Sequence, residues 1–234
     1  TEIVGHAVRA LYLYSAMADL AAETSDASLL AACERLWESA CLRRLYVTGG
    51  LGPSHLNEGF TFDYDLPNET AYAETCAAIS LAMWNQRLLQ IDCDSRYADV
   101  MERALYNGAL SCLALDGEHF FYQNPLASLG HHHRWSWTGC PCCATNIIRL
   151  LPALGNYIYA QNESEIAVHL YVQGSAQLRV AGQAVILRQE TRYPWEGTVA
   201  IRLEMERPAA FGLRLRIPGW CRSAGVRVNG AVVE

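Results

Sequence analysis

Residues 143–172 read CATNIIRLLPALGNYIYAQNESEIAVHLYV, and the pattern of apolar residues changes within this stretch. The first part, from about Cys143 to Tyr159, has a helical pattern. From Ile166 to Val172 apolar residues alternate with others, which is typical of a strand with one buried face. The stretch therefore predicts a helical domain over residues 1–160 and a β domain over residues 161–234, so that the fold class is mainly α with a following β domain.

Four further helices are predicted before residue 143, because apolar residues recur there at spacings of three and four and so share one face. They cover about Val4–Ala22, Ser28–Tyr46, Cys76–Ile91 and Arg96–Leu113, the last with Ser95 as its N-cap. Residues 48–68, rich in Gly, and residues 118–140, rich in His and aromatic side chains, predict two long loops. Long loops between helices are where a binding site is expected.

The C-terminal part predicts an antiparallel β domain built from short strands. The segment from Val226 to Val233 has Asn229-Gly230 at its centre, a pair that suits the type I′ turn of a β-hairpin. The other expected strands cover residues 166–172, 177–180, 185–188, 198–203 and 212–217. A β-sandwich of ordinary size needs more strands than these, so we expect only the start of one.

The composition argues against two classes of function. The net charge is −6, and no stripe of Lys and Arg is present to neutralise phosphates, so we expect no nucleic-acid partner. No apolar run reaches the roughly 18 residues of a membrane-spanning helix, so we expect no membrane partner. The sequence begins at Thr1 without a methionine and shows no signal-peptide pattern, and we expect the natural N-terminus to lie elsewhere.

Three of the nine cysteines crowd into the segment Gly139-Cys140-Pro141-Cys142-Cys143. Pro141 fixes the backbone just before a predicted helix, and thiols at a helix N-terminus have a lowered pKa. Two adjacent thiolates repel each other unless a cation lies between them, and zinc is the cation that sulfur ligands favour. The cluster therefore predicts metal or catalytic chemistry in a reducing compartment, which we expect to be the cytoplasm. Buried, inert thiols are the alternative, and the favoured interpretation of Cys33, Cys41 and Cys112.

Zinc usually takes about four ligands, and Glu74 with Cys76 is the best source of the two that Cys142 and Cys143 do not supply. Residues two apart point the same way on an extended chain and nearly opposite ways on a helix. Both side chains therefore reach one metal only if the helix begins at about Glu74. Three sulfurs and one carboxylate form an unusual set for a purely structural zinc site, which nevertheless stays an alternative.

Glu58 lies in the loop sequence His55-Leu-Asn-Glu-Gly-Phe. Desolvation there would raise the pKa of its carboxyl and suit it to general acid catalysis, whereas taken alone it reads as a surface charge. The histidines of this region, namely His6, His55 and the run His131-His132-His133, could bind a metal or be ordinary polar residues. Four aromatic residues could stack on sugars or pack in the core, namely Phe121, Tyr122, Trp135 and Trp137. The residues alone leave both interpretations open.

Three motifs together resemble the β-L-arabinofuranosidase family of glycoside hydrolases. They are Tyr46-Val-Thr-Gly-Gly-Leu-Gly through Asn57-Glu-Gly-Phe, then Asp63-Tyr-Asp-Leu-Pro-Asn-Glu-Thr-Ala-Tyr-Ala-Glu-Thr-Cys76, and Cys140-Pro-Cys-Cys143. The resemblance covers most of residues 1–230 and implies an (α/α)6 barrel followed by β-sandwich domains. The sequence predicts fewer helices than a whole barrel needs. We therefore expect residues 1–160 to be the C-terminal half of a catalytic barrel, and the chain to be a central segment of a longer enzyme.

The resemblance also implies roles for individual residues. Four match the zinc ligands of the family, namely Glu74, Cys76, Cys142 and Cys143. Cys142 also matches the nucleophile, Glu58 the general acid/base, and His6 a substrate-binding histidine. The implied function is a retaining glycoside hydrolase that releases L-arabinofuranose from β-linked arabinofuranosides, with Zn²⁺ as cofactor and a small-molecule or oligosaccharide substrate.

Two functions of other classes stay open at this point. One is a zinc-stabilised carbohydrate-binding or scaffolding module without hydrolytic activity. The other is a thiol redox protein that uses Cys140 with Cys142 or Cys143, although no Cys-x-x-Cys motif in a βαβ setting supports it. A third alternative keeps the enzyme and changes the sugar.

Overall fold

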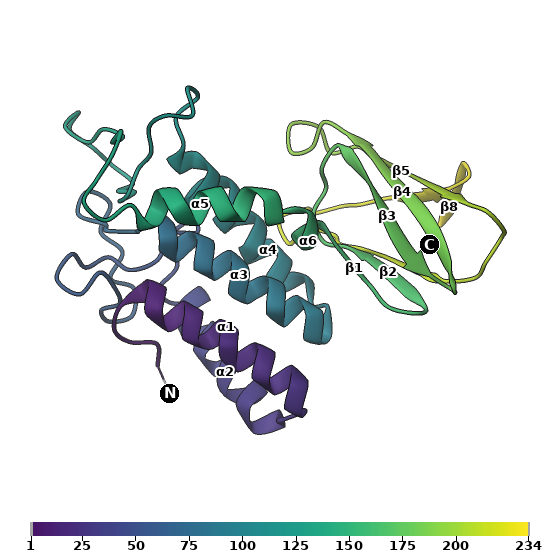
Figure 1. The fold of residues 1–234 in the computed structure, drawn as a ribbon, viewed down its shortest axis with the longest axis horizontal. Coiled ribbons are helices and arrows are strands. Elements are labelled where there is room, and N and C mark those ends of the chain that lie inside the picture. The colour runs from purple at the N-terminus through teal and green to yellow at the C-terminus, as the bar shows by residue number, and fades with distance from the viewer. Residues whose placement is uncertain (1, 234) are drawn as a thin grey trace. The chain divides into compact units, whose positions relative to one another are not determined.

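The computed structural model describes residues 2–233, with helices in the first part of the chain and strands in the second (Figure 1). This order confirms the prediction of a helical part followed by a β part. The described residues form two compact units. One comprises the residues up to Cys93 together with Val100–Leu154, and the other comprises Asp94–Asp99 together with the residues from Gly155 onward.

Helix α3 (Thr75–Asp92) lies at the centre of the helical unit. It packs against α1 (Ala7–Thr24) and α5 (Cys142–Ala153), and α1 also packs against α2 (Ala27–Cys41) (Figure 1). Every residue from Thr75 to Ala82 is buried, which is the pattern of a helix surrounded by other elements. The N-terminal half of α3 therefore forms the core that carries the candidate site.

The single helix predicted over Arg96–Leu113 is three elements. They are α4 (Ser95–Arg103), the π-helix η1 (Ala104–Ala109) and the 3₁₀ helix η2 (Leu110–Cys112). The wide π turn brings Gly108 so close to α3 that a Cβ there would lie 2.6 Å from the Cβ of Ala78. Packing against α3 therefore sets the helix geometry here. The predicted N-cap Ser95 is also wrong, because Asp94 Oδ1 accepts the hydrogen bond from the backbone N–H of Arg96 at 2.9 Å.

Two other predicted helices end early. The helix predicted over Ser28–Tyr46 stops at Cys41, and the Tyr46 N–H instead bonds the Gly50 carbonyl at 3.0 Å in the following loop. The helix predicted to reach Tyr159 ends at Ala153 and is followed by the short α6 (Gly155–Ile158) and by β1 (Tyr159–Gln161). Pro152 lacks the N–H of a helical hydrogen bond and glycine disfavours helix, and the break at Leu154 falls between Pro152 and Gly155. The two long loops are confirmed, because neither contains a helix or a strand among the described residues.

The β unit contains two three-stranded sheets and a hairpin. The sheets have the orders β1-β2-β6 and β3-β4-β5, and β7 pairs with β8. The strands after β1 are β2 (Glu165–Val168), β3 (Gly174–Val180), β4 (Gln183–Thr191), β5 (Val199–Met205), β6 (Gly212–Leu215), β7 (Val226–Val228) and β8 (Ala231–Val233). The prediction of a wholly antiparallel domain is wrong at one ladder, because β6 pairs with β2 in parallel. The long crossover through β3, β4 and β5 permits that pairing.

The two sheets share one apolar core, to which Ile166 of β2 and Val185 and Leu187 of β4 contribute fully buried side chains. The predicted hairpin is confirmed, since Val228 pairs with Ala231 across the Asn229-Gly230 turn. Both turn residues have positive φ, 50° and 87°, as a type I′ turn requires. Over residues 2–233, no helix has the length and apolar character that a bilayer crossing needs.

Candidate active site

The first half of the site forms where α3 begins. Glu74 immediately precedes α3 with an extended backbone (φ −61°, ψ 137°), and Cys76 lies in the first turn. Thr75, between them, points away and donates its hydroxyl to the Phe121 carbonyl at 2.7 Å. Because α3 begins directly after Glu74, the side chains of Glu74 and Cys76 both point to the same side of the helix start.

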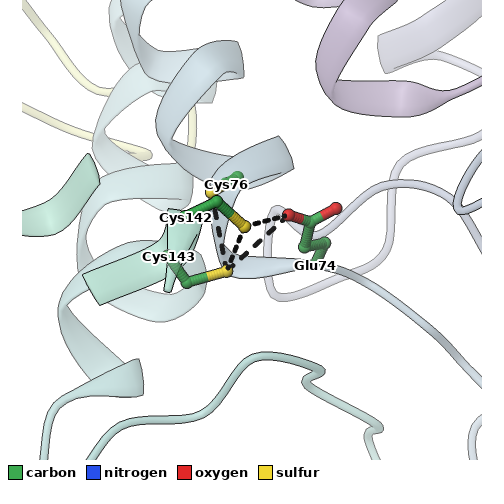
Figure 2. A group of neighbouring side chains, drawn as sticks. All are labelled: Glu74, Cys76, Cys142 and Cys143. Carbon is green, nitrogen blue, oxygen red and sulfur yellow. Dashed lines mark hydrogen bonds between the residues drawn. The ribbon is translucent and has the colours of Figure 1, made fainter. Parts of the chain in front are cut away.

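The second half forms where α5 begins. Cys142 and Cys143 are the first two residues of this helix, directly after Pro141, whose φ is −81°. The Cys143 sulfur lies 3.5 Å from that of Cys76, and the Cys142 sulfur lies 3.5 Å from Glu74 Oε1. Figure 2 shows the four side chains converging from the two helix starts. Residues more than sixty positions apart in the sequence therefore form one cluster.

One donor atom from each of the four residues lies within 4.8 Å of all the others. Glu74, Cys76 and Cys143 are buried, whereas Cys142 is half-buried and forms the accessible side of the cluster. Glu74 Oε2 is buried and has no hydrogen-bond partner among the described residues. A buried polar atom without a partner lowers the stability of the fold unless a ligand binds it. Three sulfurs and one carboxylate oxygen form a donor set that suits zinc.

The electrostatics of the cluster also favour a cation. Burial raises the pKa of Glu74, and burial raises the pKa of the Cys142 thiol to about 12. The hydrogen bond with Cys76, followed by burial, raises the pKa of Cys143. Only the pKa of Cys76 is lowered, because Cys143 donates to it. The four groups by themselves cannot all be ionised near neutral pH, and a bound divalent ion would reverse this balance.

Glu58 and His6 lie beside the cluster. His6 Nε2 is 3.2 Å from Glu58 Oε2, and donor atoms of His6, Glu58 and Glu74 all lie within 4.8 Å of one another. His6 directly precedes α1, and the Glu58 carbonyl accepts the N–H of Ala7, the first residue of that helix, at 3.0 Å. The Glu58 side chain is 41% exposed, so a substrate can reach it. The structure thus brings together all six residues to which the family resemblance gives roles.

Two tyrosines, Tyr72 and Tyr122, lie beside the cluster, and no polar role was predicted for either of them. The Tyr122 hydroxyl lies 3.2 Å from the Cys142 sulfur. Burial, followed by the nearby charges of Glu74 and Glu58, raises the pKa of the Tyr72 hydroxyl. The rings of the two tyrosines pack edge to face at 6.2 Å. Tyr72 lies two positions before Glu74, but Ala73 between them has a left-handed backbone (φ 39°), so the alternation of an extended chain could not have predicted the position of Tyr72.

The other histidines, aromatic residues and cysteines considered from the sequence do not join this cluster. His132 stacks on Phe121 at 4.8 Å, while Trp137 is 68% exposed. None of the three histidines at 131–133 belongs to a group of possible metal ligands among the described residues. Cys33 and Cys112 are buried and burial raises the pKa of each to about 11, which fits the interpretation of inert thiols.

Comparison with known proteins identifies the family to which the chain belongs. Residues 1–156 match the family described as β-L-arabinofuranosidase, GH127 catalytic domain, and residues 165–234 match the β-L-arabinofuranosidase, GH127 middle domain. The chain therefore belongs to the GH127 family of β-L-arabinofuranosidases.

Individual relatives agree with this assignment. The chain is 37% identical over 245 aligned positions to a non-reducing end β-L-arabinofuranosidase of Bifidobacterium longum subsp. longum, and covers 36% of that protein. A crystal structure of a GH127 β-L-arabinofuranosidase from Geobacillus stearothermophilus T6 has a TM-score of 0.95 and 51% identity, and the match covers 98% of this chain and 38% of that one. A second solved structure, a GH127 β-arabinofuranosidase, has a TM-score of 0.93 and 43% identity, with 100% and 39% covered. The chain thus spans little more than a third of the length of these relatives.

Proposed function

We propose that the chain carries the catalytic centre of a retaining glycoside hydrolase that releases L-arabinofuranose from β-linked arabinofuranosides. The observation that carries the proposal is that two groups of different chemistry flank one carboxylate. Glu58, partly exposed, and Cys142, half-buried, each have a donor atom within 4.8 Å of a Glu74 carboxylate oxygen. A retaining glycosidase needs a nucleophile and an acid/base group that reach the same glycosidic bond.

Glu74, Cys76, Cys142 and Cys143 would hold a zinc ion. When bound, it would keep the Cys142 thiol deprotonated and make its sulfur a better leaving group. The orphaned Glu74 oxygen and the raised pKa of Cys142 both support a cation here. The three crowded thiols must stay reduced, and we therefore also propose the cytoplasm as the compartment.

The Cys142 sulfur attacks the anomeric carbon while Glu58 donates a proton to the departing glycosidic oxygen. The C–S bond forms as the C–O bond breaks, which gives a thioglycosyl-enzyme. Glu58 then takes a proton from water, the water oxygen attacks the same carbon, and the sulfur departs as thiolate. Two inversions leave the configuration retained. His6, 3.2 Å from Glu58, orients that carboxyl and binds the sugar.

The finer fold assignment is also a proposal. We propose that residues 1–160 form the C-terminal half of an (α/α)6 catalytic barrel and that residues 161–234 form part of a β-sandwich. Its support is the match of residues 1–156 and 165–234 to two successive domains of the family.

The test is zinc content and hydrolysis of p-nitrophenyl β-L-arabinofuranoside, measured together on the full-length protein. Wild type and Cys140→Ser should bind about one zinc per chain and hydrolyse the substrate, because Cys140 is exposed and outside the cluster. Cys142→Ser should lose turnover, and Glu58→Gln should keep zinc and lose activity by about 100-fold or more.

Each alternative gives a different result. Zinc without hydrolysis in the wild type would favour either an enzyme that acts on a different sugar or a structural zinc site in a binding or scaffolding module. A Cys142→Ser variant that keeps most of its activity would show that Cys142 is not the nucleophile. A metal-free, active wild type would exclude the zinc site.

A further inference from the structure

The backbone is strained immediately before the first proposed zinc ligand. Ala73 directly precedes Glu74 and has a φ of 39°, in the left-handed region that residues other than glycine rarely adopt. Such a conformation persists only where neighbouring contacts hold it. Glu74 Oε1 lies 3.5 Å from the Cys142 sulfur and 3.7 Å from the Cys143 sulfur (Figure 2). The direction in which Glu74 points to these sulfurs therefore depends on the contacts that fix Ala73.

Asn124, in the second long loop, makes several of those contacts. Its side-chain Nδ2 donates to the Ala73 carbonyl at 2.9 Å and to the Thr75 hydroxyl oxygen at 3.0 Å. Its backbone N–H donates to the Tyr72 carbonyl at 3.1 Å. One asparagine thus binds the chain on both sides of Glu74.

These hydrogen bonds set the conformation of Ala73. The Ala73 N–H donates to the Gly52 carbonyl at 2.8 Å, which fixes the peptide plane that precedes Ala73. The Ala73 carbonyl lies in the peptide plane that joins Ala73 to Glu74, and the Asn124 side chain fixes this second plane. Because two fixed planes define both dihedral angles of the residue between them, loss of the Asn124 side chain would free Ala73 to relax.

The same contacts join the start of α3 to the loop that carries Tyr122. The Thr75 hydroxyl, which accepts from Asn124, donates to the Phe121 carbonyl at 2.7 Å. The Thr75 N–H donates to the Tyr122 carbonyl at 2.9 Å. Successive hydrogen bonds of this kind strengthen one another. This part of the loop and the start of α3 therefore form one hydrogen-bonded unit.

From these contacts we infer that Asn124 is a positioning residue of the proposed zinc site, whose side chain holds Ala73 in the left-handed conformation that directs Glu74 toward the sulfurs. The inference rests on the proposed function, in which Glu74 is a zinc ligand, but it concerns zinc affinity, which is measured without hydrolysis. Without the Asn124 side chain Ala73 relaxes, and zinc binds only after the strained conformation has formed again.

The test measures the zinc Kd of the full-length protein by competition with a fluorescent chelator. Asn124→Asp removes both side-chain N–H donors at nearly constant size and should raise the Kd about tenfold. The negative charge that it adds would by itself attract a cation, so charge does not explain a weaker affinity. Asn107→Asp is the matched control, because Asn107 is exposed in η1, and it should leave the Kd within about twofold of wild type.

Ala73→Gly separates positioning from a general loss of stability. Glycine adopts a positive φ without strain, so Ala73→Gly combined with Asn124→Asp should recover about fivefold of the lost affinity. Alone, it should leave the Kd within about twofold of wild type. A merely structural role of Asn124 predicts the opposite, because Ala73 is buried and the loss of its methyl group would add to the damage.

Urea unfolding of the same samples shows whether each variant is folded, and Asn124→Ser replaces Asn124→Asp if the latter is not. An unchanged Kd in the Asn124 variant would overturn the inference, as would a double variant that binds zinc no better than Asn124→Asp alone. A wild type that binds zinc and hydrolyses no arabinofuranoside would overturn the proposed function, while a raised Kd and its recovery would still support the inference. A wild type that binds no zinc would overturn both.

Discussion

Gly59→Ala tests whether the backbone around Glu58 sets the activity. Gly59 packs directly on the segment before α1, where the Phe60 N–H donates to the Gly5 carbonyl at 2.9 Å. A Cβ on Gly59 would lie 1.9 Å from that carbonyl oxygen and 2.8 Å from the Cα of His6. Both contacts are with backbone, which cannot rotate away as a flexible side chain can.

The size of this steric clash sets the expected loss of activity. Real Cβ atoms essentially never approach other atoms within 3.0 Å, so the two segments must separate by about 1.1 Å at the Gly5 carbonyl. Those segments carry the proposed acid/base Glu58 and its partner His6. A displacement of about 1 Å at reacting groups can lower the rate about 100-fold, and we expect a loss of this size in kcat/KM. Zinc content should not change, because the four ligands lie on other segments.

The assay is hydrolysis of p-nitrophenyl β-L-arabinofuranoside with zinc content and circular dichroism measured on the same samples. Gly197→Ala is the matched control, because a Cβ at this position meets no atom within 4 Å. A Gly59→Ala variant with normal zinc and activity within about twofold of wild type would refute the link between this close approach and the position of Glu58.

Two further predictions concern stability. Burial, followed by the charge of Arg216, lowers the pKa of His169 from 6.5 to about 4. Between these pH values the unfolded chain takes up a proton that the folded chain does not, so the free energy of unfolding falls as the pH drops through this window, by at most about 3 kcal/mol. His169→Leu should reduce this loss in urea titrations at pH 7 and pH 4.5, and an unchanged difference would contradict the assignment. Removing zinc with a strong chelator should lower the Tm of the helical unit by roughly 10 °C in calorimetry, because the folded state then loses the free energy of metal binding; an unshifted transition would argue against a metal at the cluster.

The elements that could be predicted from sequence are those with a local cause. Apolar residues at spacings of three and four predict a helix over Cys76–Ile91, and α3 covers Thr75–Asp92. The Asn229-Gly230 pair has one favoured turn, and the structure contains it. Such features depend on a few neighbouring residues, which the sequence displays directly.

The features that could not be predicted depend on residues distant in sequence. The π turn at η1 serves the contact between Gly108 and Ala78, and apolar periodicity does not reveal it. The parallel pairing of β2 with β6 joins strands that three others separate. The Tyr122 hydroxyl lies 3.2 Å from the Cys142 sulfur, a contact between distant segments that the sequence does not display. The roles of the six site residues rest on the motifs and stay predictions, although the structure brings these residues together.

The position of the cluster at two helix starts has a consequence for the proposed chemistry. Three thiolates and one carboxylate carry four negative charges, and a divalent ion would neutralise half of them. The N-termini of α3 and α5 each contribute about half a positive charge, which leaves a net charge of about −1 at the cluster. A glycosidic bond breaks with positive charge developing on the sugar ring, so this residual negative charge beside Cys142 would stabilise the transition state more than the neutral substrate. The N-termini of α3 and α5, which position the ligands, would therefore also reduce the negative charge of the cluster to a level that favours glycoside cleavage.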